Sequence, residues 1–177
     1  MADNDLPLPQ IILQYNGLYD FDGMYAALVD WAKHYGYLWH EFVYKHKVPE
    51  QGAEQEMMWY MTKKVTDYIH FKIAFDVHIW DMYEVDVTTE GKKKTLTNAR
   101  ITLKIDGTVT YDWQQRFKGS KFLKTMGKWY YKLLKKDIEA VYVDMLYYRI
   151  WNLHAVLKKY FDMQTKQYAY KGYLKEH

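Results

Sequence analysis

The chain contains no cysteine, only three prolines and no long uninterrupted apolar run. The lack of cysteine excludes disulfide bonds, thiol catalysis and cysteine-ligated zinc. Its most apolar segment, 140–157, carries charged and polar side chains such as Asp144 and Arg149, so it does not predict a transmembrane helix. The first residues are acidic and lack the apolar core of a secretion signal. We therefore expect a cytoplasmic protein without a transmembrane segment.

Motifs of known catalytic sites are also lacking. The chain shows no glycine-rich phosphate loop, no nucleophile elbow and no nucleophile–base pair at recognisable spacing. His70, Asp76 and His78 share one face of a predicted strand, where Asp76 and His78 could both reach one metal ion. No further metal motif accompanies them. The preferred interpretation is that they are ordinary side chains on the solvent-exposed face of the sheet. We predict no catalytic residues, no metal and no cofactor.

Two carboxylates stand out against the strand pattern. Glu41 and Asp81 could fall on apolar strand faces, and burial of a carboxylate is a common feature of functional acids. A structural carboxylate beside a bulge is the preferred interpretation of both. They do not predict an enzyme.

Aromatic residues are abundant instead: 19 Tyr, 7 Trp and 7 Phe make up 19% of the chain. Tyr and Trp combine a large apolar body with a polar tip, which suits interfaces as well as cores. A core built from large rings is the first interpretation. An interface or a ligand cavity is the alternative.

Alternating apolar side chains predict an antiparallel sheet. A short strand at 11–15 precedes a helix at 21–35, which Asp20 caps and Gly36 ends. The clearest alternation begins at Ile69, and its inversion around Asp81 predicts a bend or bulge at 79–83. Asp106-Gly107 is typical of a two-residue hairpin turn. The strand-like runs after the first helix are 37–48, 54–65, 69–87, 96–105 and 109–117.

A long helix is predicted from Ser120 to about Tyr168. The fold class is then α+β: a curved antiparallel meander of about five to six strands packed on a long C-terminal helix, with a short helix after the first strand. This order of elements is similar to the helix-grip layout of Bet v 1-like and START-like domains, which usually have two short helices where this chain predicts one. We expect a flexible acidic tail at 1–9, one domain at 10–167 and a Tyr-rich tail at 168–177.

Positive charge gathers at the start of the long helix. Between Arg116 and Lys136 there are eight Lys or Arg residues and no acid. Positive charge in a first turn opposes the helix dipole, so helix stability does not call for it. A solvated lysine face is one interpretation, and contact with an anionic surface, either lipid or nucleic acid, is the other. The candidate anion-binding residues are Arg116, Lys118, Lys121, Lys124, Lys128, Lys132 and Lys135.

The second part of the long helix, 138–157, is apolar around most of its circumference and must be covered on more than one side. The helix at 21–35 is the expected second wall, and another protein chain is the alternative. We expect a non-enzymatic binding domain, with a hydrophobic or amphipathic ligand between the sheet and the long helix. The alternatives are an assembly protein that forms oligomers or docks through 138–157, and a binder of lipid or nucleic acid. Candidate cavity residues are Met57, Trp59, Met61, Phe75, Trp113, Tyr142 and Met145.

Overall fold

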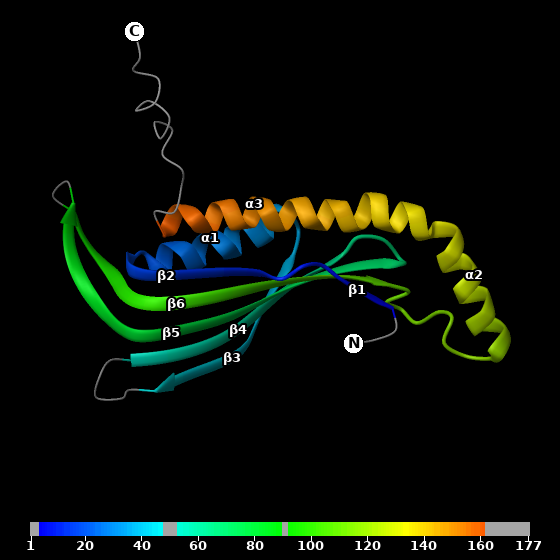
Figure 1. Cartoon of the computed structure of the whole chain (residues 1–177), viewed down its shortest axis with the longest axis horizontal. Helices are drawn as coiled ribbons and strands as arrows, with labels where there is room; N and C mark the ends of the chain where they lie inside the picture. The colour runs from blue at the N-terminus through cyan, green and yellow to red at the C-terminus, as the bar shows by residue number, and fades with distance from the viewer. Residues whose placement is uncertain (1–3, 48–52, 90–91, 162–177) are drawn as a thin grey trace, which may run out of the picture.

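The computed structural model describes residues 4–47, 53–89 and 92–161. It shows an α+β fold, in which a large antiparallel sheet carries helices on one face (Figure 1). The prediction of this fold class, with a long helical stretch at the end of the chain, is confirmed. In chain order the elements are β1 (Asp5–Pro7), β2 (Ile11–Tyr19), α1 (Phe21–His34), β3 (Leu38–Lys47), β4 (Ala53–Lys64), β5 (Ile69–Thr89), β6 (Lys92–Tyr111), α2 (Lys121–Asp137), the π-helical segment η1 (Ile138–Val143) and α3 (Asp144–Tyr160).

The sheet has six strands, and β3, β4, β5 and β6 follow one another as a meander. The N-terminal strands β1 and β2 both pair with β6, along different parts of its length. Residues 5–7, which the sequence placed in a flexible tail, are therefore part of the sheet. The Thr110 hydroxyl donates to the Asp5 carboxylate at 2.7 Å, and Leu8 is buried directly after the strand. The predicted tail at 168–177 lies outside the described residues.

The predicted hairpin at Asp106-Gly107 is wrong. β6 runs through both residues, which pair with Ala74 and Ile73 of β5. A Cβ atom on Gly107 would lie 2.3 Å from Cδ1 of Ile150 on α3. Glycine stands here because the long helix approaches the sheet closely, and not because the chain turns.

The alternation in β5 is confirmed as the centre of the core. Its helix-facing side chains are each at most 2% exposed, while Lys72 on the other face is exposed and His70 and His78 are half-buried. Period-2 alternation works here because successive side chains of a strand point to opposite faces of the sheet. The buried set is Ile69, Phe71, Ile73, Phe75, Val77 and Ile79.

The predicted irregularity at 79–83 is also confirmed. The pairing of β5 with β6 shifts register between Trp80 and Tyr83, and Asp81 has a φ of 56°. Beyond this point the paired ends of β5 and β6 curve toward the helix side of the sheet (Figure 1). A bulge lets a 21-residue strand bend within a small fold.

The positive φ at Asp81 predicts how substitutions at this position affect stability. Asp81→Gly and Asp81→Val both remove the carboxylate that pairs with Arg100 at 3.5 Å, so they differ mainly in backbone preference. We expect the valine variant to unfold about 1–2 kcal/mol more easily than the glycine variant, because a β-branched residue resists the left-handed region. Urea denaturation of the two variants measures this difference. Equal stability would contradict the left-handed conformation.

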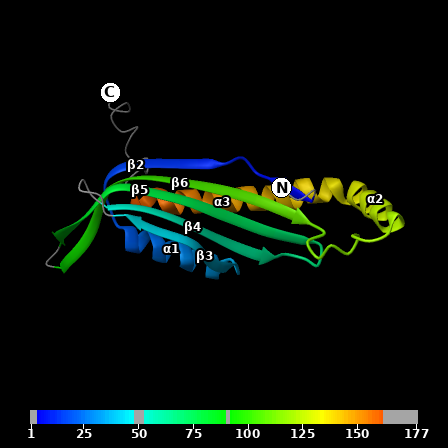
Figure 2. The ribbon, with the colours of Figure 1, turned by 90° about the horizontal axis from the view of Figure 1, so that it is seen from below.

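The long helix is covered on two sides, by the sheet and by α1. Leu146, Ile150, Leu153 and Leu157 of α3 are buried. The helices α1 and α3 lie side by side on the same face of the sheet, and the Trp31 indole N–H donates to Asn152 Oδ1 at 2.9 Å. Figure 2, seen from below, shows the strands in front of α3. No helix within the described ranges combines the length and the apolar composition that a membrane span requires.

Candidate functional site

The helix α2 is set apart from the rest of the fold. It continues into α3 through η1, but it bends away from the line of α3 and extends beyond the end of the sheet (Figure 1). Every residue of α2 is at least partly exposed. Side chains along the whole of α2 are therefore accessible to solvent.

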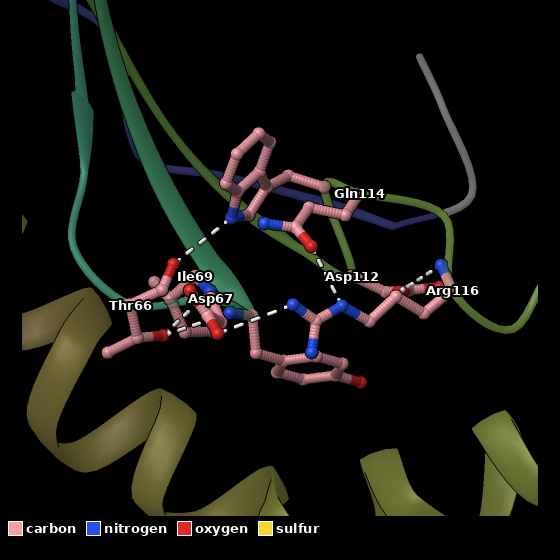
Figure 3. Close-up of polar contacts among 8 residues, drawn as sticks. Thr66, Asp67, Ile69, Asp112, Gln114 and Arg116 are labelled. Carbon is pink, nitrogen blue, oxygen red and sulfur yellow. Dashed lines mark hydrogen bonds and ion pairs between the residues drawn. The ribbon is translucent and has the colours of Figure 1, made fainter.

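The loop before α2 is held by a small polar network (Figure 3). The Asp112 carboxylate accepts from the backbone N–H of Arg116 at 2.9 Å and of Phe117 at 3.4 Å. The Arg116 guanidinium lies 3.3 Å from Asp67 Oδ2. Ser120 then caps the helix as predicted, because its hydroxyl accepts from the Leu123 N–H.

Aromatic packing fixes how α2 is rotated about its axis. The Tyr130 ring lies 5.1 Å from Tyr68 and 5.7 Å from Phe117, between centroids, and Tyr131 stacks on Tyr111 at 4.3 Å. Burial raises the pKa of the Tyr68 hydroxyl, and the nearby Asp112 carboxylate raises it further. These contacts turn one face of α2 toward the body of the protein and leave the others in solvent.

Part of the predicted basic stripe is already paired. Arg116 pairs with Asp67, Lys118 donates to Gln115 Oε1 at 2.9 Å, and Lys135 lies 3.7 Å from Glu139. The remaining members are exposed and form no ion pair with any residue that the structure describes. We call these four the lysine face: Lys121, Lys124, Lys128 and Lys132.

A second outer face of α2 is apolar. Its side chains recur at intervals of three or four residues, so they line one side of the helix. We call them the apolar face: Phe122 (74% exposed), Met126 (38%), Trp129 (65%) and Leu133 (63%). Trp129 and Lys132 are three residues apart and therefore neighbours on the helix surface. The lysine face and the apolar face share this border.

The candidate cavity residues do not form one site. Met57 and Trp59 line an open cleft of about 420 Å³ beside α1. Met61 and Phe75 are buried in the core. The last three lie elsewhere: Trp113 in the loop before α2, and the half-buried Tyr142 and Met145 on the long helix. The cleft also contains residues that the sequence did not single out as cavity residues, namely Phe21, Tyr25, Glu41, Phe42 and Tyr44.

Three potential metal ligands meet on the outer face of the sheet. Glu54, Glu56 and His78 place one ligand atom each within 4.8 Å of the others. His78 Nε2 lies 2.6 Å from Glu54 Oε1, and Glu56 pairs with Lys45 at 3.3 Å. The partners of His78 come from the neighbouring strand, which strand periodicity alone does not reveal. The group is satisfied by these polar contacts.

No protein-family model matches the chain, and a comparison with curated proteins finds no significant match.

Proposed function

We propose that this protein is a non-enzymatic binding domain that attaches to an anionic membrane surface through α2. The observation that carries the proposal is that an exposed apolar face lies beside the lysine face on α2. The ammonium groups of the lysine face form no ion pair among the described residues. A helix of this kind lies in the membrane interface, with its apolar side chains among the acyl chains and its lysines at anionic headgroups.

The chemistry of the apolar face favours lipid over nucleic acid. Nucleic acid would contact the lysine face through its phosphates and could stack bases on Trp129. It offers little to the aliphatic side chains of Met126 and Leu133, which remain in water in such a complex. An acyl layer covers all of the apolar face at once, since its members lie along one side of a 17-residue helix about 26 Å long.

The rest of the fold serves as the scaffold for α2. We propose that it is a helix-grip variant with a single helix between β2 and β3, because a curved antiparallel sheet packs against α3. The space between sheet and α3 holds the buried side chains Leu146, Ile150, Leu153 and Leu157. Because these side chains fill the space between the sheet and α3, we propose that this part of the fold is a rigid scaffold and not a ligand chamber.

Vesicle binding tests the proposal. We expect the wild type to bind vesicles that contain phosphatidylserine at low salt and not vesicles of phosphatidylcholine alone. Replacing Lys121, Lys124 and Lys128 by Gln should weaken binding about a hundredfold, at ~1 kcal/mol per lysine. Co-sedimentation at low and moderate salt measures the affinity, which should fall as salt screens the lysines.

A charge-matched variant provides the control. Lys33, Lys72 and Lys159 are exposed lysines outside α2, and their replacement by Gln changes the net charge equally. This control should bind like the wild type. If both triple variants lose the same affinity, or if the wild type binds no anionic vesicle, the proposal is wrong. Lysine-dependent binding to duplex DNA without vesicle binding would assign α2 to nucleic acid instead.

A further inference from the structure

The open cleft is lined by residues of α1, β3 and β4. The helix α1 lies over the end of the sheet that is far from α2 (Figure 1). Its volume of about 420 Å³ is in the range of a small-molecule site. The side chains that line it come from three elements: Phe21 and Tyr25 of α1, Glu41, Phe42 and Tyr44 of β3, and Met57 and Trp59 of β4.

An irregularity in β3 builds one wall of this cleft. Glu41 lies opposite Trp59 and Tyr44 lies opposite Met57, and the register shifts between Glu41 and Val43. Side chains three residues apart in a regular strand point to opposite faces of the sheet. The extra residue, Phe42, places both Glu41 and Tyr44 on the face that carries Trp59 and Met57. The bulge thus brings a carboxylate in among aromatic rings.

The inner rings of the cleft pack on one another, and Trp59, only 4% exposed, forms its floor. The Trp59 centroid lies 5.2 Å from that of Tyr25 and 6.4 Å from that of Phe21. At the open side Phe42 is 72% exposed and Tyr44 is 65% exposed. Phe42 also contacts Tyr60 at the sheet edge, so Tyr44 is the more accessible ring within the cleft. The face of an aromatic ring carries a negative quadrupole and attracts cations.

The charge in the cleft has the sign that a cation requires. Glu41 is the charged lining residue, and the other side chains are aromatic or apolar. The Tyr25 hydroxyl donates to Glu41 Oε1 and so holds the carboxylate beside the rings. Burial raises the pKa of Tyr25, and Glu41 raises it further, which keeps the hydroxyl protonated as a donor. Glu41 forms no ion pair with any other residue in the described ranges.

We infer that this cleft binds a small organic cation that carries an alkylated ammonium group. Such a group has apolar substituents for the rings of Tyr25 and Tyr44 above the Trp59 floor, and a positive charge that Glu41 can neutralise. An anion would be repelled by the carboxylate, and a neutral apolar ligand would make no use of it. A metal ion would find a single carboxylate among apolar groups, which is too few ligands.

Choline and its neutral isostere 3,3-dimethylbutanol are suitable probes, because they differ mainly in charge. We expect choline to bind in the millimolar range or better, and the isostere to bind about tenfold more weakly. Glu41→Gln should weaken choline binding by about tenfold and leave the isostere unchanged. Tyr44→Ala should weaken choline binding about threefold, as expected for one exposed cation–π contact. Ligand-detected NMR and isothermal titration calorimetry measure these affinities.

Tyr148→Ala is the matched control, since Tyr148 is also an exposed tyrosine but lies outside the cleft. It should bind choline like the wild type, and thermal unfolding should show all variants folded. Failure of choline to bind, equal binding of the isostere, or an unchanged affinity in Glu41→Gln would each overturn the inference. Displacement of free choline by phosphatidylcholine vesicles would show that the ligand is a lipid headgroup and not a small molecule. The choline affinities do not test α2, which is tested by its lysine variants on phosphatidylserine vesicles.

Discussion

Phe75→Ala is expected to lower the free energy of unfolding by about 3–5 kcal/mol, the range for removing a fully buried aromatic ring from a core. Phe75 lies at the middle of the sheet, opposite Trp59 on β4 and Ile105 on β6. Its ring is 5.8 Å from that of Trp39, and the residue is only 2% exposed. Because strands surround it on both sides, the cavity cannot close by a local shift.

Lys72→Ala on the exposed face of the same strand is the control. The Lys72 ammonium lies over the Tyr60 ring at 5.2 Å, an exposed contact worth less than about 1 kcal/mol. Equilibrium denaturation in urea gives both values. A loss below about 1 kcal/mol for Phe75→Ala would contradict the buried position of its ring.

Gly107→Ala is expected to destabilise the protein by about 1–3 kcal/mol, the usual cost of overpacking a core. The added Cβ would lie 2.3 Å from Cδ1 of Ile150, a closer approach than real side chains make. Ile150 is buried against the sheet, so its side chain has little room to move. The clash would lie between the C-terminal part of β6 and α3.

A second variant isolates this clash. Ile150→Val removes the Cδ1 atom that the new Cβ would meet, and alone it should cost about 0.5–1.5 kcal/mol. In the double variant the losses should not add, because the methyl group that causes the clash is gone. Urea denaturation of the two single variants and the double variant gives the coupling free energy. Simple additivity would show that α3 does not approach β6 at Gly107.

Local signals explain which parts of the fold could be predicted from the sequence. The alternation in β5, the capping residues Asp20 and Ser120, and the inversion at Asp81 each depend on neighbours in the chain. Asp106-Gly107 predicts a turn wrongly, because a glycine after aspartate suits both a tight turn and a close approach. Only the packing of α3 against the sheet distinguishes a turn from a close approach, and this tertiary contact cannot be read from neighbouring residues.

The same distinction applies to the two candidate sites. Helical spacing alone places the lysine face on one side of α2. Phe122 and Trp129 remain in solvent because of the direction in which α2 points. The bend at η1 and the packing of Tyr130 set this direction. In the cleft, Met57 and Trp59 were predicted, but the role of Glu41 depends on the bulge at Phe42. The sequence carries no recognisable signal for that bulge.

The pairing of the N-terminal strands with β6 has a consequence for how the chain folds during synthesis. Ile11 of β2 pairs with Ile105, and Tyr19 pairs with Thr97. While the ribosome makes the chain, β2 must wait for a partner that emerges after β3, β4 and β5. Contacts between residues so distant in sequence slow folding, because a long loop must close before they form. We expect the β3–β5 meander to assemble first and the N-terminal strand β2 to dock late. Until β6 is made, β2 stays unpaired and depends on chaperones or on its own solubility.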